Sequence, residues 1–158
     1  MQKNLIIILD NVRSAFNVGS IFRTADAAQN VEIFLCGLTP TPDNPKIYKT
    51  SLGAEKTVKW KYFRNTLEAI KHLEKENIPI YSVELTKNSK HFQDFKYFEN
   101  NQENIALVFG HEINGVSEPV LEKSKDCIYI PMKGKKESLN VGITASILIF
   151  EALRYNKV

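Results

Sequence analysis

Apolar runs rich in β-branched residues alternate with amphipathic stretches along the chain. The runs span residues 5–9, 31–35, 78–83, 105–109 and 127–130, and each is long enough for a strand buried on both faces. Helical spacing of apolar residues is found at 17–28, 66–75 and 139–154. Because strands and helices alternate, the pattern predicts an α/β fold with a largely parallel sheet and helices on both faces.

Two segments between these elements lack periodicity. Residues 39–49 contain three prolines, which predicts an irregular loop. Residues 88–104 are polar and aromatic, which indicates weaker structure. The chain has 158 residues and no repeat or low-complexity stretch, so we expect a single domain over 1–158.

Composition narrows the class of protein only slightly. Hydrophobic residues make up 43% and charged residues 25%, as in ordinary globular proteins. The first apolar run is too short for a signal peptide or a membrane span. Cys36 and Cys127 form no CxxC pair, so we expect free thiols and no zinc site. These features predict a cytoplasmic protein.

The charge balance permits nucleic-acid binding without requiring it. The formal net charge is +3, so clustering matters more than the total. The basic residues gather in two clusters, Lys56, Lys59, Lys61 and Arg64, then Lys133, Lys135 and Lys136. The first cluster is either ordinary solvated surface charge or a phosphate-binding site, and the sequence alone favours neither interpretation.

Three segments share one form, a strand followed by a turn with Asn, Gly or Ser and then a helix start. They cover residues 9–27, 105–117 and 127–146. In open α/β sheets, ligands collect beyond the carboxyl ends of strands, where helix N-termini offer unpaired N–H groups. We therefore expect the three segments to face one pocket.

The first two segments contain the main candidates for chemistry. Asn17 is suited to cap the first helix, and Arg23 lies on its predicted core side, where an unpaired cation would be costly. Gly110 lets a ligand approach the backbone, while Glu112 is either a site residue or a turn residue. The pair His111–Glu112 lacks the second histidine of a HExxH motif, so no metal is expected.

The third segment excludes two classes of nucleotide-binding enzyme. Ser138 is predicted to cap the final helix. Gly134–Lys135 lacks the upstream glycine and the following Ser or Thr of a phosphate loop, and no GxGxxG follows the early strands. Both a nucleoside triphosphatase and a dinucleotide-binding enzyme are therefore disfavoured.

Together the three segments resemble, in order and spacing, the signature motifs of the SpoU (TrmH) RNA methyltransferase family of the SPOUT superfamily. The first motif is matched by Asn17, Gly19 and Arg23. The second is matched by Gly110, Glu112, Asn114 and Gly115. The third is matched by Ile130, Pro131, Met132, Ser138, Leu139, Asn140 and Val141. One departure is Gly142, which stands where the family often has Ser.

The resemblance implies a fold and an activity. It implies a deep trefoil knot in the carboxyl-terminal third, which general topology rules disfavour. It implies S-adenosylmethionine-dependent methylation of a ribose 2′-hydroxyl in structured tRNA or rRNA, without a metal. It further implies a homodimer packed through the knot region. Many relatives carry an additional RNA-binding domain, and we expect none here.

The resemblance also assigns roles to residues. Backbone groups of Gly110, Ile130 and Leu139 are expected to hold the donor's adenosine, with Phe109 and Met132 in the same pocket. Arg23 is expected to activate the 2′-hydroxyl, either as general base or by gripping a phosphate and stabilising the oxyanion while water or a carboxylate takes the proton. Deprotonating an arginine at neutral pH costs roughly 8 kcal/mol, which favours the second role.

Supporting roles follow from the same resemblance. Glu112 is expected to order the site through Arg23 or the substrate ribose, and Asn17 to position Arg23 or the nucleotide. Asn140 and Ser138 are expected to shape the pocket. One alternative is a non-catalytic RNA-binding module of the same fold, and another is a nucleotide-binding α/β enzyme of a different class.

Overall fold

Seven strands lie side by side in one sheet, in the order β3-β2-β1-β6-β4-β7-β5. The computed structural model describes residues 2–154 and 156, and within them every strand pair is parallel. The strands are β1 Asn4–Asp10, β2 Val31–Cys36, β3 Trp60–Phe63, β4 Ile80–Val83, β5 Lys90–His91, β6 Asn104–Gly110 and β7 Asp126–Tyr129. After β3 the chain returns past β1 to form β4, so the strand order reverses beside β1 and β6.

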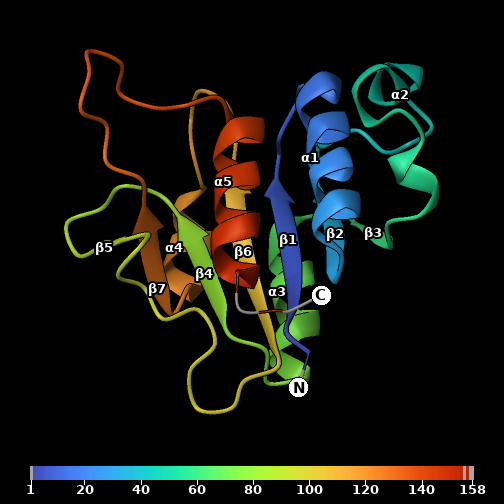
Figure 1. Ribbon diagram of the computed structural model, residues 1–158. Coiled ribbons are helices and arrows are strands. Elements are labelled where there is room, and N and C mark those ends of the chain that lie inside the picture. The colour runs from blue at the N-terminus through green and yellow to red at the C-terminus, as the bar shows by residue number, and fades with distance from the viewer. Residues whose placement is uncertain (1, 155, 157–158) are drawn as a thin grey trace.

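Helices cover both faces of the sheet, as predicted. They are α1 Ala15–Ala28, α2 Pro45–Ser51, the short 3₁₀ helix η1 Ala54–Lys56, α3 Thr66–Lys75, α4 Glu118–Lys123 and α5 Val141–Leu153. Figure 1 shows α1 and α5 together on one face and α3 behind the sheet. No helix in the described part of the chain is long and apolar enough to cross a membrane.

The core consists of two layers, one on each face of the sheet. Leu5, Ile7 and Leu9 of β1 pack with α1 and α5, whereas Ile6 and Ile8 pack with α3 and α4. Successive side chains of a strand point to opposite faces, and here both faces are covered. This arrangement explains why the strands read as continuous apolar runs rather than as alternating ones.

Several elements differ from the sequence-based prediction. The helix over 66–75 is confirmed. The prediction of an irregular loop over 39–49 is wrong for its second half, because α2 begins at Pro45. Asn44 caps this helix, and its Oδ1 accepts from the Lys46 amide at 3.0 Å. Proline suits the first helical turn, so it starts this helix instead of preventing it. Strand β3 and helix α4 were not predicted, because β3 is largely exposed and α4 is short.

Both predicted helix caps are wrong by two or three residues. Helix α1 is capped by Ser14, whose Oγ accepts from the Asn17 amide at 3.3 Å. Helix α5 begins at Val141 and is capped by Asn140, whose Oδ1 accepts from the amides of Gly142 and Ile143 at 2.8 and 3.3 Å. Therefore Asn17 does not cap its helix, and its side chain is available for other contacts.

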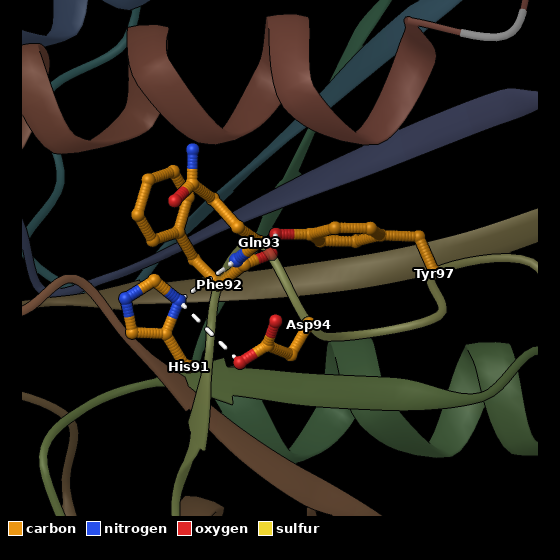
Figure 2. Close-up of polar contacts among 5 residues, drawn as sticks. All are labelled: His91, Phe92, Gln93, Asp94 and Tyr97. Carbon is orange, nitrogen blue, oxygen red and sulfur yellow. Dashed lines mark hydrogen bonds and ion pairs between the residues drawn. The ribbon is translucent and has the colours of Figure 1, made fainter.

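An aromatic segment supports the edge of the sheet formed by β7 and β5. Figure 2 shows the Tyr97 hydroxyl, which donates to the Phe92 carbonyl at 2.8 Å, and His91 Nδ1, which accepts from the Gln93 amide at 3.2 Å. The His91 ring meets Tyr129 of β7 edge-on, with centroids 5.8 Å apart. Since Phe92 packs against the core, this segment is more ordered than its polar composition predicts.

The two cysteines are free thiols, as expected. Burial raises the pKa of the Cys36 thiol to about 12, so this side chain is not a nucleophile at neutral pH. Cys127 is half-buried in β7.

Candidate functional site

A pocket of about 970 Å³ lies at the carboxyl ends of β4, β6 and β7, and it is lined by residues of the second and third motif-bearing segments. Its lining includes every predicted donor-binding residue, namely Phe109, Gly110, Ile130, Met132 and Leu139. It also includes Glu112, Ser138 and Asn140. This position is where ligands bind in open α/β sheets, beside the reversal in strand order. The second and third segments therefore share one pocket, whereas no residue of the first segment belongs to its described lining.

A chain of hydrogen bonds joins one polar residue from each segment. The Asn17 amide nitrogen Nδ2 lies 3.4 Å from Glu112 Oε1. Asn17 Oδ1 in turn accepts from Asn140 Nδ2 at 3.0 Å. These residues are 95 and 123 positions apart in sequence. Asn17 thus holds the first segment against both of the others.

The carboxylate of Glu112 binds the start of α1. Its oxygens accept from the amides of Arg13 and Ser14 at 3.1 and 2.9 Å, where a helix N-terminus favours negative charge. Desolvation of this carboxyl raises its pKa, but the amides of Ser14, Glu112 itself and Arg13 outweigh that effect, and the pKa is lowered. Glu112 is therefore an anion at neutral pH.

Two glycines allow the second segment to fold back on itself. A Cβ atom on Gly110 would lie 2.1 Å from the Gly115 carbonyl carbon and 2.2 Å from the Val116 amide nitrogen. Gly115 has φ +68°, and a Cβ there would lie 2.3 Å from Glu84 Oε2. No larger residue fits at either position without moving backbone or the Glu84 carboxylate. This turn brings Glu112 to the N-terminus of α1.

Two acidic residues that the sequence analysis missed help to build the site. Asp10 is buried at the end of β1 and accepts from Thr66 Oγ1 at 2.6 Å and from the Ser117 amide at 2.9 Å. Glu84 follows β4 and accepts from the Val116 amide at 3.1 Å. A carboxylate directly after a buried strand was the available signal in both cases.

The pocket lining is acidic. Its charged members are Glu84, Glu112, Glu118 and Glu137, and no lysine or arginine belongs to the described lining. Apolar walls are supplied by Phe109, Ile128, Ile130, Met132 and Leu139. Such a cavity suits a ligand with an aromatic part and a positive charge.

The structure corrects two expectations about Arg23. Its side chain is exposed on α1, not near the core. It lies outside the pocket lining, and it is about 9 Å further along the helix axis than Asn17. Glu112 contacts Arg13, Ser14 and Asn17 rather than Arg23. Within the described chain, Arg23 makes no hydrogen bond or ion pair, so its guanidinium is free to bind a ligand.

Comparison with known proteins identifies the family. The model of the SpoU rRNA Methylase family matches residues 4–150. A tRNA (guanosine(18)-2′-O)-methyltransferase of Thermus thermophilus is 33% identical over 153 residues, which cover 97% of this chain and 76% of that protein. The chain therefore belongs to the SpoU rRNA Methylase family.

Solved structures share the fold. The structure of a putative RNA methyltransferase of the TrmH family from Porphyromonas gingivalis has a TM-score of 0.85 and 30% identity, over 99% of this chain and 61% of that one. The AdoMet-bound rRNA methyltransferase of Sinorhizobium meliloti has a TM-score of 0.88 and 24% identity, over 100% of this chain and 59% of that one. This chain thus spans about three-fifths of the length of these two structures.

Proposed function

We propose that this protein transfers a methyl group from S-adenosylmethionine to a ribose 2′-hydroxyl in structured RNA, tRNA or rRNA. One observation carries the proposal: the second and third family motifs line one pocket, and Asn17 of the first motif is hydrogen-bonded to Glu112 and Asn140 of that lining. The Thermus thermophilus relative bears the name of such an enzyme. A non-catalytic module has no need for an acidic pocket of this kind.

The pocket fits the donor in shape and charge. S-adenosylmethionine carries a sulfonium and an ammonium, which the carboxylates of Glu84 and Glu112 favour, and an adenine, which the apolar walls favour. Backbone groups of Gly110, Ile130 and Leu139 hold the adenosine, and Phe109 and Met132 complete its surroundings. Gly110 lets the ligand approach the turn closely.

The chemistry requires alignment and removal of one proton. When bound, the donor supplies a methyl group made electrophilic by its sulfonium. The ribose oxygen bonds to the methyl carbon as the carbon–sulfur bond breaks, and the hydroxyl proton passes to water or a carboxylate. Arg23, which lies outside the pocket lining, binds the phosphate next to the target ribose and so holds the substrate in place. The guanidinium is exposed and has no partner among the described residues, which suits this role better than that of a base.

The remaining polar residues position these groups. Asn17 and Glu112 fix the first turn of α1. Arg23 lies on the same helix, about two turns further along. Asn140 holds Asn17 from the third segment, and Ser138 lines the pocket beside it. No metal takes part in this scheme, so transfer should be unchanged in excess EDTA.

Two measurements test the function. Titration calorimetry should detect a single site for S-adenosylmethionine. RNA from cells with and without the protein should differ at a 2′-O-methylated nucleotide, mapped by its resistance to alkaline cleavage. Donor binding without any such mark would favour the non-catalytic alternative, and absence of donor binding would disprove the proposal.

Arg23 can be tested separately from donor binding. We expect Arg23→Ala to retain donor affinity and to lose at least a hundredfold in methyl transfer, because its group acts on the substrate. Lys71→Ala, at an exposed position on α3, is the control and should be unaffected. Unchanged turnover of Arg23→Ala would remove this residue from the mechanism.

We also propose that the protein is a homodimer packed through α5. Ile143 and Phe150 are 54% and 53% exposed, and Ile147 between them is half-buried, which makes an apolar stripe at i, i+4 and i+7. On α1 beside it, Phe16 is 46% exposed. In sedimentation measurements, Phe150→Glu should give monomers. The control Leu67→Glu, on the opposite face of the sheet, should not.

The fold-level proposals rest on family membership. Residues 1–158 are proposed to act as one methyltransferase domain in the cytoplasm. The carboxyl-terminal third is proposed to form a deep trefoil knot, in which the segments around residues 110–116 and 130–141 line the same pocket. A crystal structure that traces the chain through both segments tests the knot.

A further inference from the structure

Positive charge is concentrated at one edge of the molecule. Residues 44–64, which include α2, η1 and β3, contain six basic residues and one acidic residue, a formal charge of +5. The whole chain carries +3, so the remaining residues together carry −2. Residues 44–64 are called the basic lobe below. In Figure 1 its helix α2 stands beside α1, on the side away from α5.

Most of this charge is not neutralised by the protein. Within the described chain, Lys61 is the only one of the six bases in an ion pair, with Glu32 at 3.5 Å, and Lys56 interacts electrostatically with its neighbour Glu55. The acidic residue of the lobe, Glu55, accepts a hydrogen bond from Ser51. Exposed cations without partners suit a polyanion.

Exposed aromatic rings lie among these cations. Tyr48, Trp60 and Tyr62 are 55%, 36% and 51% exposed. Trp60 is paired with Ile33 and Tyr62 with Leu35, whose side chains belong to the layer that packs with α1. Both rings therefore lie on the face of the sheet that carries α1 and α2. Cations beside exposed rings are the combination that binds unpaired nucleotides, by phosphate contacts and base stacking.

The basic lobe is joined to the first turns of α1. The Thr50 hydroxyl of α2 donates to the Phe16 carbonyl at 2.7 Å, next to Asn17. Gly19 packs so tightly on α2 that a Cβ there would lie 2.3 Å from the Ile47 carbonyl oxygen. Arg23 is four residues after Gly19, on the neighbouring part of the helix surface. A strand of RNA held by the lobe would thus run directly to Arg23.

We propose that the basic lobe binds an unpaired stretch of the RNA substrate and so delivers the target ribose to Arg23 and the pocket. This inference rests on the proposed function, which makes the pocket the place of methyl transfer. RNA binding by the basic lobe can nevertheless be measured without methyl transfer, so this inference and the proposed function can fail separately.

The first test removes charge in two places. In the full-length protein, Lys46, Lys49 and Lys56 are replaced together by Ala, and binding of a fluorescent RNA hairpin with a ten-nucleotide loop is followed by anisotropy. We expect the Kd to rise at least tenfold, and the slope of log K against log salt to become shallower by about 2 to 3. The control replaces Lys71, Lys75 and Lys96, which are also exposed, and should bind like wild type. Equal losses in both variants would show a net-charge effect and overturn the proposal.

The second test addresses stacking. Tyr48→Ala and Trp60→Ala should each weaken binding of the hairpin roughly tenfold, while Tyr48→Phe, which keeps the ring, should bind normally. Donor affinity by calorimetry should be unchanged in all variants, which confirms that they fold. Unchanged RNA affinity in the alanine variants would overturn the stacking role. Wild-type protein that binds RNA through the lobe yet transfers no methyl group would disprove the proposed function alone.

Discussion

The pocket and the basic lobe lie on opposite sides of the same helix and carry opposite charge. Asn17 of α1 bonds toward the pocket, whereas Gly19, about 200° further round the helix, packs on α2. The charged residues of the pocket lining are four glutamates, and the lobe has six bases against one acid. A cationic donor and a polyanionic substrate are thereby attracted to different surfaces, and α1 sets the distance between them.

The two regions also differ in how they are built. The pocket is made from separate turns of the chain, two of which are tied to Asn17, 95 and 123 residues away in sequence, by side-chain hydrogen bonds. The lobe is one continuous stretch of 21 residues, from 44 to 64. We expect the pocket to be sensitive to single substitutions, and the lobe to respond in small additive steps.

The largest effect is expected at Gly110. In Gly110→Ala the new Cβ meets the backbone of Gly115 and Val116 at 2.1 and 2.2 Å, so the turn that carries Glu112 must move. Such overpacking costs about 1–3 kcal/mol or more. We expect donor affinity by calorimetry to fall at least a hundredfold and the melting temperature to drop. RNA binding by the lobe should persist, which would separate the two regions.

The matched control is Gly134→Ala. No atom of the described residues lies within 4 Å of a Cβ built at Gly134, so both affinities should be unchanged. If Gly110→Ala bound the donor like wild type, the turn would be more adaptable than the contacts indicate.

The next effect is expected at Asn17, the residue that connects α1 to the pocket. Asn17→Ala removes the bonds to Glu112 and Asn140. Losing one hydrogen bond to a charged group and one to a neutral group costs about 2 kcal/mol. We therefore expect kcat/KM for methyl transfer to fall roughly thirtyfold. The Ser20 hydroxyl donates to the Phe16 carbonyl and to no other group of the described residues, so Ser20→Ala should stay close to wild type.

A double-mutant cycle shows whether the network acts as one unit. Asn17→Ala combined with Glu112→Gln should lose less than the sum of the two single losses. Full additivity would mean that Asn17 and Glu112 act independently.

A smaller effect concerns pH. The lowered pKa of Glu112 means that its carboxylate stabilises the folded protein at pH above the usual glutamate value of 4.5. That contribution is lost as pH falls below 4.5 and through the folded-state pKa. Melting temperatures of wild type and Glu112→Gln should therefore differ at pH 7 and converge toward pH 3. Parallel curves over that range would show that Glu112 does not titrate with folding.

The sequence predicted the pocket better than the lobe, for physical reasons. Strands buried on both faces must be apolar runs, so β1, β2 and β6 were found within one residue at each end. Glycine and asparagine at strand ends marked the turns, and convergence followed from parallel topology. The lobe has neither signal, since β3 is exposed at the sheet edge and the prolines before α2 indicated a loop.

The errors within the site have a common cause. The caps were misplaced because Ser14 and Asn140 lie within three residues of equally suitable capping residues, Asn17 and Ser138. Arg23 was expected near the core because Ile21, Phe22 and Ala25 surround it in sequence. At 100° per residue, however, it points away from Ile21 and Ala25 and lies a quarter-turn from Phe22, and its side chain is exposed. Contacts such as Asn17 with Asn140 depend on tertiary structure and have no local signal.

The smallest effect tests the charge of the pocket itself. Glu118 and Glu137 are exposed members of its lining, and exposed charges are well screened by solvent. Replacing both by Gln should weaken S-adenosylmethionine binding only about two- to fivefold, more at low salt than at high salt. S-adenosylhomocysteine lacks the sulfonium charge, so its affinity should change less. Replacing Glu103 and Glu122, exposed residues outside the lining, removes the same charge and should leave the donor affinity unchanged. Equal losses for both ligands would mean that these carboxylates act through shape rather than charge, and the electrostatic half of the comparison with the lobe would fail.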